Sequence, residues 1–292
     1  MRYTSDWKEY SLLDASHGER LEKWGDRILI RPDPQIIWKT EKTNPKWQQS
    51  DAIYHRSTKG GGHWNKLNKN MSDSWIIFYK NLKFGIKMMN FKHTGVFPEQ
   101  AVNWDLLQKI ISSQKQNMSI LNLFAYTGGA TLACAEKGAK VCHVDASKGM
   151  VAWAKENAKL SKLDSCPIRW IVDDCEKFVR REIKRGNKYD GIIMDPPSYG
   201  RGPKGEIWKI EDNIFDFILL CKSLLSENAK FFMINSYSTG LSPSVMAYLL
   251  SEIIKKQRGG FVYSDEIGIP VESSHLVIPS GATAIWSTEK LF

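Results

Sequence analysis

Short hydrophobic runs recur along the last two thirds of the chain, separated by longer amphipathic stretches. Runs at 119–124, 141–145, 168–172, 189–194 and 230–235 predict buried strands. The stretches between them predict helices at 130–137, 149–160, 175–184, 214–225 and 244–256, and two final strands are expected at 260–264 and 282–287. This alternation is typical of the α/β class. It predicts a doubly wound, mostly parallel, seven-stranded sheet with helices on both faces.

The first third of the chain follows a different pattern. Residues 1–88 are rich in Trp and Tyr, with turn-forming residues between short apolar runs. Strands are predicted at 27–31 and, as a pair, at 75–79 and 82–86 around Lys80-Asn81. The sequence therefore predicts two domains. A small β-rich domain covers residues 1–88, with substrate binding as its hypothesised role, and an α/β domain covers residues 89–292.

Composition and charge narrow the class of protein. With 292 residues, of which 42% are hydrophobic and 25% charged, the chain is typical of a globular protein. Its net charge of +9 favours a polyanionic partner such as RNA, DNA or an anionic membrane surface. No run of 18 apolar residues occurs, so a membrane span is not expected.

Cysteine and histidine usage adds expectations about location and metals. The five cysteines are odd in number and none has C-x-x-C spacing, so free thiols in a reducing compartment are expected. The segment from Met1 to Tyr10 is charged and predicts no signal peptide, which favours the cytoplasm. Three histidines, His63, His93 and His275, lack matched ligand spacing, and no metal site is predicted.

The residues that follow each predicted strand carry the candidate chemistry, because open parallel sheets bind ligands beyond the carboxyl ends of their strands. After the first strand, Gly128 and Gly129 allow a tight turn and open a helix whose amide groups favour an anionic group. After the second strand, Asp145 lies 16 residues past Gly129, where a carboxylate can accept hydrogen bonds from ribose hydroxyls. A ligand-free turn and a helix cap are the alternatives.

The third and fourth strands end in further carboxylates. Asp174 can accept a hydrogen bond from an adenine amino group, or it can cap the following helix. Asp195 precedes Pro196 and Pro197, which stiffen the chain and remove two amide donors. The resulting acceptor-rich edge suits an amino group on a flat substrate, and Tyr199 can stack against such a substrate. A proline-rich surface turn is the alternative.

Five ordered segments resemble the class I S-adenosylmethionine (SAM)-dependent methyltransferases, and more narrowly the 23S ribosomal RNA methyltransferase I-like group. They are Phe91–Gln100, Asn122–Gly129, Val144–Ser147, Asp174–Phe178 and Asp195–Gly202, within a match that runs from Phe91 to about Trp286. The PUA-type RNA-binding module of some members is not recognisable in residues 1–88.

The resemblance implies a cofactor and a set of site residues. SAM is the expected cofactor, with ribosomal RNA as the expected partner. The expected cofactor-binding residues are Phe124, Tyr126, Thr127, Gly128, Gly129, Asp145, Ala146, Ser147, Asp174, Cys175 and Asp195. The expected catalytic residues are Asp195, Pro196 and Tyr199, and the expected substrate-binding residues are Phe97, Gln100, Arg201 and Tyr237. The basic, glycine-rich stretch 201–209 is either a lid over the substrate or a plain mobile loop.

The acceptor atom is predicted from the placement of the cysteines. Methylation of cytosine at carbon needs a nucleophilic thiolate, and Tyr237 stands where the related cytosine enzymes carry cysteine. Methylation of an exocyclic amine needs only proton acceptors and an aromatic contact, which favours that reaction here. The alternatives are a SAM-dependent protein or small-molecule methyltransferase and a non-catalytic nucleic-acid-binding protein on the same fold. Nicotinamide-dependent oxidoreduction is disfavoured because G-x-G-x-x-G is missing.

Overall fold

The computed structural model describes residues 1–57, 61–201, 207–238 and 240–292, without the side chain of Arg201. The chain forms two compact units. The α/β unit comprises Met1–Arg2, Val102–Ile267 and Ser280–Phe292, and the N-terminal unit comprises Tyr3–Ala101 and Gly268–Pro279. The N-terminal unit thus extends past the expected boundary at residue 88 and takes in a second, distant segment. That each unit folds as an independent domain stays a prediction.

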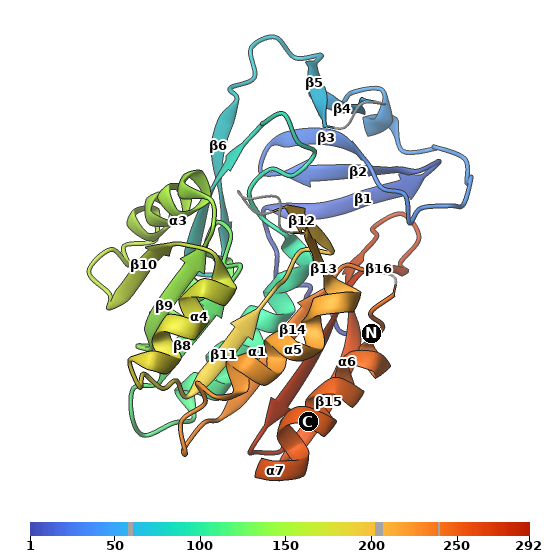
Figure 1. The fold of residues 1–292 in the computed structure, drawn as a ribbon. Helices are drawn as coiled ribbons and strands as arrows, with labels where there is room; N and C mark the ends of the chain where they lie inside the picture. Colours follow the sequence, from blue (N-terminus) through green and yellow to red (C-terminus); the bar gives the residue numbers. More distant parts are fainter. Residues whose placement is uncertain (58–60, 202–206, 239) are drawn as a thin grey trace. The chain divides into compact units, whose positions relative to one another are not determined.

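A seven-stranded sheet in the order β10-β9-β8-β11-β14-β16-β15 runs through the α/β unit. Its strands are β8 (Ser119–Leu123), β9 (Lys140–Asp145), β10 (Ile168–Val172), β11 (Gly191–Met194), β14 (Phe231–Ser236), β15 (Phe261–Pro270) and β16 (Val277–Ser287). The first five strands of that order pair in parallel, and β16 pairs antiparallel to β14. The doubly wound, mostly parallel sheet expected from the sequence is confirmed (Figure 1).

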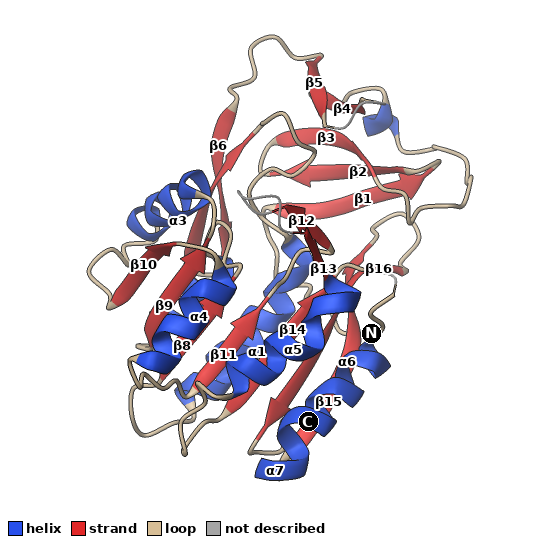
Figure 2. Ribbon diagram, viewed as in Figure 1, coloured by secondary structure: helices blue, strands red, loops and turns tan. Residues whose placement is uncertain are grey.

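Helices cover both faces of this sheet (Figure 2). They are α1 (Ala101–Ser112), α2 (Gly129–Glu136), α3 (Lys148–Leu160), α4 (Cys175–Lys184), α5 (Ile210–Lys222), α6 (Pro243–Leu250) and α7 (Lys256–Arg258), with a π-helical turn at Ser251–Lys255. Helix α1 is not predicted by the apolar runs. The expected helix at 244–256 is a helix with that π-helical turn inside it, so its backbone hydrogen bonds shift register there.

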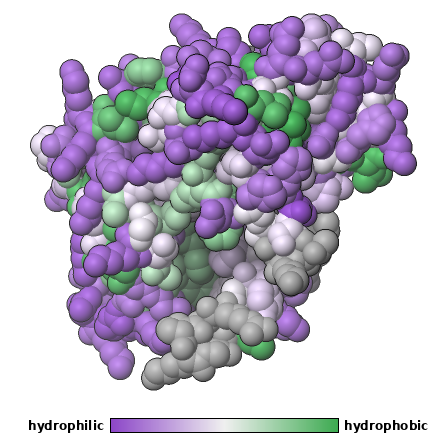
Figure 3. All heavy atoms as spheres, turned by 90° about the horizontal axis from the view of Figure 1, so that it is seen from above, coloured by the Kyte–Doolittle hydropathy of each residue, from purple (hydrophilic) through white to green (hydrophobic). Residues whose placement is uncertain are grey.

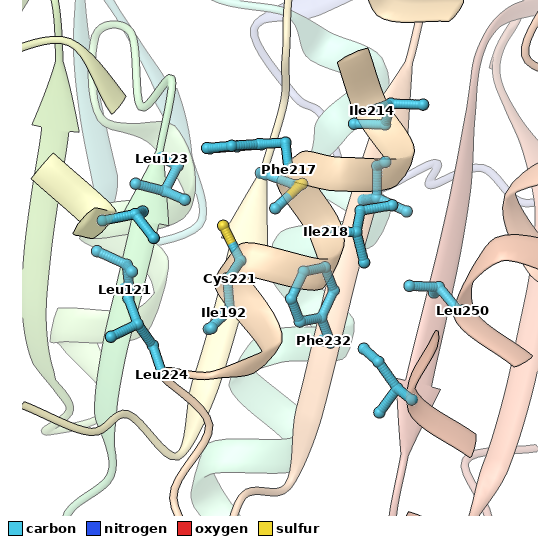
Figure 4. Packing of buried hydrophobic residues seen from close by; sticks show 14 of the residues in the cluster. Leu121, Leu123, Ile192, Ile214, Phe217, Ile218, Cys221, Leu224, Phe232 and Leu250 are labelled. Atoms are coloured by element: carbon cyan, nitrogen blue, oxygen red, sulfur yellow. The ribbon is translucent and has the colours of Figure 1, made fainter. Parts of the chain in front are cut away.

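Successive residues of the central strands pack on opposite faces of the sheet. Leu121 and Leu123 of β8 join the core beneath α4, α5 and α6, whereas Ile120 joins the core beneath α1 and α2. Figure 4 shows the first of these cores, where Phe217 of α5 and Phe232 of β14 belong to one cluster. Because both faces are buried, these strands read as continuous apolar runs, which is why the sequence predicts them well.

The N-terminal unit is built from two antiparallel-rich sheets. The larger one has the order β1-β2-β3-β4-β5, with β1 (Tyr10–Ser16), β2 (Glu19–Trp24), β3 (Arg27–Pro32), β4 (Ala52–Arg56) and β5 (Gly62–Lys66). The other is a hairpin of β6 (Ser74–Tyr79) and β7 (Leu82–Lys87). The β-rich character, strand β3 and the hairpin around Lys80 follow the sequence prediction.

Strands β1, β2, β4 and β5 are not predicted by the apolar pattern. The reason is clearest in β2, where Glu22 is fully buried and takes a core position that an apolar residue would usually fill. Its carboxylate accepts hydrogen bonds from Tyr10 and Arg31, so the charge is paired inside the sheet. A buried ion pair therefore hides the strand from pattern-based prediction.

Hydrophilic residues cover most of the face seen in Figure 3, and hydrophobic residues gather there only in small patches. Several large apolar side chains lie inside, among them Trp24, Tyr79 and Trp286, which are almost fully buried. Among the helices that the structure describes, none is long and apolar enough to cross a bilayer.

Candidate active site

The carboxyl ends of the parallel strands meet at one edge of the α/β sheet. Leu123 of β8 is paired with Val144 of β9 and with Met194 of β11, and Met194 is paired with Ile234 of β14. The chain runs outward from β8 through β9 to β10 and then returns to the other side of β8 as β11. This reversal of strand order is where doubly wound sheets bind their ligands. The residues expected to bind cofactor and the Asp195 segment are brought to this edge.

The loop after β8 has a strained backbone. Phe124 and Tyr126 have positive φ angles of 55° and 51°, and Gly128 has a φ angle of 90°. Left-handed conformations of residues with a Cβ cost about 1–3 kcal/mol each and cluster at ligand sites. The surroundings hold this shape, because the Ala125 N–H donates to the Val144 carbonyl at 3.0 Å.

Both glycines of the loop are in close contact with neighbouring helices. A Cβ at Gly128 would lie 3.1 Å from the Cβ of Ala154, and a Cβ at Gly129 would lie 2.5 Å from the ring of Trp104. Gly129 is the first residue of α2, whose N-terminal amide groups favour an anionic group such as a carboxylate. The loop is therefore shaped by close packing against Ala154 and Trp104 as well as by its backbone hydrogen bonds.

Asp145 ties the loop after β8 to the end of β9. Its Oδ2 atom accepts a hydrogen bond from the Tyr126 N–H at 2.9 Å, and its Oδ1 atom accepts one from the Ser147 N–H at 2.8 Å. Burial raises the pKa of Asp145 above its ordinary value, although the two N–H donors oppose that shift. Each carboxylate oxygen can accept a second hydrogen bond. The two oxygens of Asp145 can therefore accept hydrogen bonds from a pair of ribose hydroxyls.

The segment that follows Asp145 turns at once into α3. Ala146 is exposed, and the Ser147 side chain accepts a hydrogen bond from the Met150 N–H at 3.4 Å, as expected for a helix cap. Thr127 is buried, and its carbonyl accepts a hydrogen bond from the side chain of Asn157 on α3 at 2.9 Å. Helix α3 thus holds the glycine loop through the hydrogen bond from Asn157.

The residues after β10 have different surroundings. Asp174 is exposed and caps α4 by accepting a hydrogen bond from the Lys177 N–H at 2.9 Å. Cys175 is buried, and its sulfur accepts a hydrogen bond from the Phe124 N–H at 3.4 Å. Capping is thus one role of Asp174, and its contact with adenine stays a prediction.

Asp195 and the two prolines follow β11. Asp195 is half-buried, and its N–H donates to the Leu123 carbonyl at 3.4 Å. The Pro197 carbonyl accepts a hydrogen bond from the Trp208 indole at 2.6 Å, and the Ser198 carbonyl accepts one from the Ile210 N–H. In the described parts of the chain, the Pro196 carbonyl has no such donor, so it keeps its acceptor capacity beside Asp195.

Tyr199 opens a two-stranded hairpin of β12 (Tyr199–Arg201) and β13 (Ile207–Lys209). Its side chain is 50% exposed. Arg201 lies in β12, but its side chain and residues 202–206 are outside the described residues, so the expected lid at 201–209 stays a prediction. The base of the hairpin is anchored by Trp208, whose ring centroid lies 5.9 Å from that of Phe124 and 5.7 Å from that of Phe217.

Tyr237 follows β14 at the same edge of the sheet. It is half-buried, and a Cβ at Gly281 of β16 would lie 2.9 Å from its ring, so the ring rests against that glycine. The next residue, Ser238, donates a hydrogen bond to Glu211 of α5 at 2.9 Å. These contacts fix the loop after β14 at its start.

Phe97 and Gln100 belong to the N-terminal unit. The Phe97 ring centroid lies 4.9 Å from that of His93, and the Phe97 carbonyl accepts a hydrogen bond from the Gln100 N–H at 3.1 Å. Gln100 is buried. Their expected place beside the substrate stays a prediction.

Sequence reasoning did not predict a buried polar network beneath the glycine loop. Asn122 donates to Thr131 at 2.9 Å, and the Thr131 hydroxyl lies 2.9 Å from Nδ1 of His143. Burial lowers the pKa of His143 to about 3, so its ring is neutral. The sequence did carry a signal for this network, because Asn122 and His143 are polar residues within apolar strands. Buried polar groups need hydrogen-bond partners.

No cysteine is suited to nucleophilic attack. Burial raises the pKa of Cys142 to about 11 and raises the pKa of Cys134, Cys175 and Cys221 above the ordinary thiol value. Cys166 is partly exposed but precedes β10, at the amino edge of the sheet. Over the described ranges, no three His, Cys, Asp or Glu side chains are grouped to hold a metal ion.

The fold and this edge define a class I methyltransferase, with a glycine loop and an acidic strand end at the point where strand order reverses. Residues 37–218 match a model of the S-adenosylmethionine-dependent methyltransferase family, and the chain belongs to that family. It is therefore an enzyme that uses SAM. The polar groups at this edge fit SAM. Asp145 offers hydrogen-bond acceptors for the ribose hydroxyls, and the N-terminus of α2 offers N–H groups for the carboxylate of SAM.

Solved structures and curated proteins agree with this assignment. A SAM-dependent methyltransferase from Agrobacterium tumefaciens is 35% identical, with a TM-score of 0.91 over 98% of this chain and 93% of that chain. A methyltransferase from Streptococcus mutans shares the fold at 17% identity, with a TM-score of 0.72 over 97% of this chain and 76% of that chain.

Among curated proteins, the ribosomal RNA large subunit methyltransferase K/L of Colwellia psychrerythraea is 26% identical over 73% of this chain and 27% of its own length. The protein of the same name from Pseudoalteromonas atlantica is 32% identical over 52% of this chain and 21% of its own length. The chain therefore spans about a quarter of the length of these curated relatives.

Proposed function

We propose that this enzyme transfers a methyl group from SAM to an exocyclic amine of a base in large-subunit ribosomal RNA, in the cytoplasm. One observation carries the choice of acceptor. Asp195 and the Pro196 carbonyl form an acceptor-rich strand end at the switch point of the sheet, and no reactive thiol accompanies them. The choice of RNA rests on the net charge of +9 and on the names of the curated relatives.

In this proposal Asp145 and the glycine loop bind and orient the cofactor. The carboxylate of Asp145 accepts hydrogen bonds from the ribose hydroxyls, and the N-terminus of α2 receives the carboxylate of the amino-acid part. SAM supplies an electrophilic methyl group on a positively charged sulfur. Because the strained loop is already held by packing against Trp104 and Ala154, little reorganisation is needed when the cofactor binds.

The substrate base is held by acceptors and by an aromatic ring. Asp195 and the Pro196 carbonyl accept the two amine protons, and this aims the nitrogen lone pair at the methyl carbon. As the N–C bond forms, the C–S bond breaks and its electron pair stays on sulfur. The proton that the amine then loses passes to the Asp195 carboxylate. Tyr199 stacks on the face of the base.

Cytosine carbon methylation fits the site less well. It needs a thiolate that adds to the base, and the side chain at the start of the loop after β14 is Tyr237. The buried cysteines have raised pKa values, so their thiols stay protonated near neutral pH.

Transfer of labelled methyl from SAM to total RNA and, separately, to total protein tests the proposal. Nuclease and protease digestion provide the controls. Label in RNA that digestion releases as an N-methylated nucleoside is the expected result. Label in a carbon-methylated pyrimidine would contradict the acceptor, and label in protein or metabolites alone would contradict the substrate.

A further inference from the structure

A short segment of the N-terminal unit, Asn90–His93, is fixed against the larger sheet by its backbone. The Asn90 carbonyl accepts a hydrogen bond from the Tyr54 hydroxyl of β4 at 3.1 Å. The Lys92 carbonyl accepts one from the Arg31 guanidinium of β3 at 3.0 Å. The segment is thus held in place next to a group of cationic side chains.

The two arginines of that group are neutralised by carboxylates. Arg20 and Arg31 lie directly opposite each other in neighbouring strands, an unfavourable arrangement of like charges. Arg31 is paired with Glu22 through two hydrogen bonds at 2.6 and 2.7 Å, and Arg20 is paired with Asp33. Both carboxylates are used in these pairs.

Lys92 lacks a comparable partner. Its ammonium group donates to the Pro32 carbonyl at 3.4 Å, and the described chain provides no carboxylate within salt-bridge distance. The side chain is half-buried, and Arg56 is an exposed second cation at the end of β4. Burial, together with the charges of Arg31, Arg56 and Arg20, lowers the pKa of Lys92 to about 8, while Asp33 opposes this shift. A bound anion would offset these effects.

The residues beside Lys92 are suited to a nucleic acid. Phe91 is 59% exposed, so its ring is accessible to a flat partner such as a base. His93 does not add charge, because burial and the nearby arginines lower its pKa to about 3. A cation for a phosphate next to an aromatic ring for a base is how proteins bind single-stranded RNA.

We propose that Lys92 and Arg56 bind a backbone phosphate of the RNA substrate on the N-terminal unit and that Phe91 stacks on an adjacent base. The inference rests on the proposed function for its choice of RNA. It assigns to the N-terminal unit a contact with the RNA backbone that is independent of the cofactor edge.

Binding of a labelled single-stranded fragment of large-subunit ribosomal RNA to the full chain tests the site, measured over a range of salt concentrations. We expect Lys92→Met to weaken binding about 5- to 20-fold and to reduce the slope of log K against log salt by about 0.7, the value for one lost phosphate contact. Lys92→Arg should keep the slope. Lys69→Met, which removes an exposed lysine of the same unit, is the matched control and should change affinity less than about twofold.

Amine acetylation followed by peptide mass spectrometry gives a second readout that needs no catalysis. At pH 8 Lys92 should react readily, and the RNA fragment should protect it while leaving Lys69 reactive; inorganic phosphate should protect it more weakly. Equal salt slopes for the Lys92 and Lys69 variants, or no protection by RNA, would overturn the inference. If RNA protects Lys92 but accepts no methyl group, the site stands and the proposed reaction fails.

Discussion

The two units place the carboxylates of their strands differently. In the α/β unit Asp145 stands at the end of β9, where two backbone N–H groups hold its carboxylate. In the N-terminal unit Glu22 stands in the middle of β2, where it pairs with Arg31 inside the sheet. We expect a carboxylate at a strand end to be available to a ligand, whereas a carboxylate in mid-strand is used for folding. The predicted effects of substitution differ accordingly.

Glu22→Gln should have the largest effect, on stability. The substitution leaves Arg31 buried without its counter-charge, which costs about 3–5 kcal/mol. Burial raises the pKa of Glu22, but Arg31 and the other partners lower it by more, so the folded value lies below the ordinary 4.5. The advantage of the native residue is therefore present above that pH and is lost as the pH falls through the folded pKa.

Urea unfolding at pH 7 and at several acidic pH values measures this effect. The gap between the native protein and the Glu22→Gln variant should narrow as the pH falls. If the variant were as stable as the native protein at pH 7, the charge of Glu22 would not be needed for folding. The expected difference between the two units would then be wrong.

Asp195→Ala should come next, with its effect on turnover. Loss of a group that accepts the amine proton should lower kcat about 100- to 1,000-fold, as for removal of one transition-state hydrogen-bond partner. SAM affinity should fall less than about tenfold, the equivalent of 1.4 kcal/mol. Steady-state kinetics with RNA and SAM separate the two quantities, and Asp195→Asn is the matched control for shape. An unchanged kcat would mean that the reacting centre does not lie at the end of β11.

Asp145→Ala should weaken SAM binding. In the proposal its carboxylate accepts hydrogen bonds from the ribose hydroxyls, and bonds to a charged group contribute about 1.5–3 kcal/mol each. Calorimetric titration with SAM should give a Kd raised about 10- to 100-fold. Asp174→Ala, at the next strand end, is the comparison, and it should raise the Kd less because Asp174 is exposed. A larger effect at Asp174 would reverse the assignment of the two carboxylates.

Ser147→Ala should have the smallest effect. Its side chain caps α3, and loss of such a cap costs about 1 kcal/mol of stability. Chemical unfolding of the variant measures this, and Ser147→Asp should restore the loss. A cost near that of Glu22→Gln would mean that the strand-end residues contribute as much to folding as the mid-strand ion pair does.

The contrast also explains which features the sequence predicts. Buried parallel strands are apolar on both faces, so β8, β9, β11 and β14 appear as runs, and the residues after them are found by position. Glu22 breaks the apolar pattern of β2 because its pairing with Arg31 is a tertiary event. Trp208 was not predicted as an anchor, since its aromatic partner Phe124 is distant in sequence. The Asn122, Thr131 and His143 network depends on three separate elements in the same way.

Trp208 joins two loops that have separate tasks. Its indole donates to the carbonyl of Pro197, in the loop after β11, and its ring packs against Phe124, in the loop after β8. A ligand that shifts either loop therefore changes the energy of the other through this one side chain. By thermodynamic linkage, the factor by which bound SAM changes the affinity for substrate must equal the factor by which bound substrate changes the affinity for SAM. Trp208 is thus a side chain through which the two affinities can be coupled.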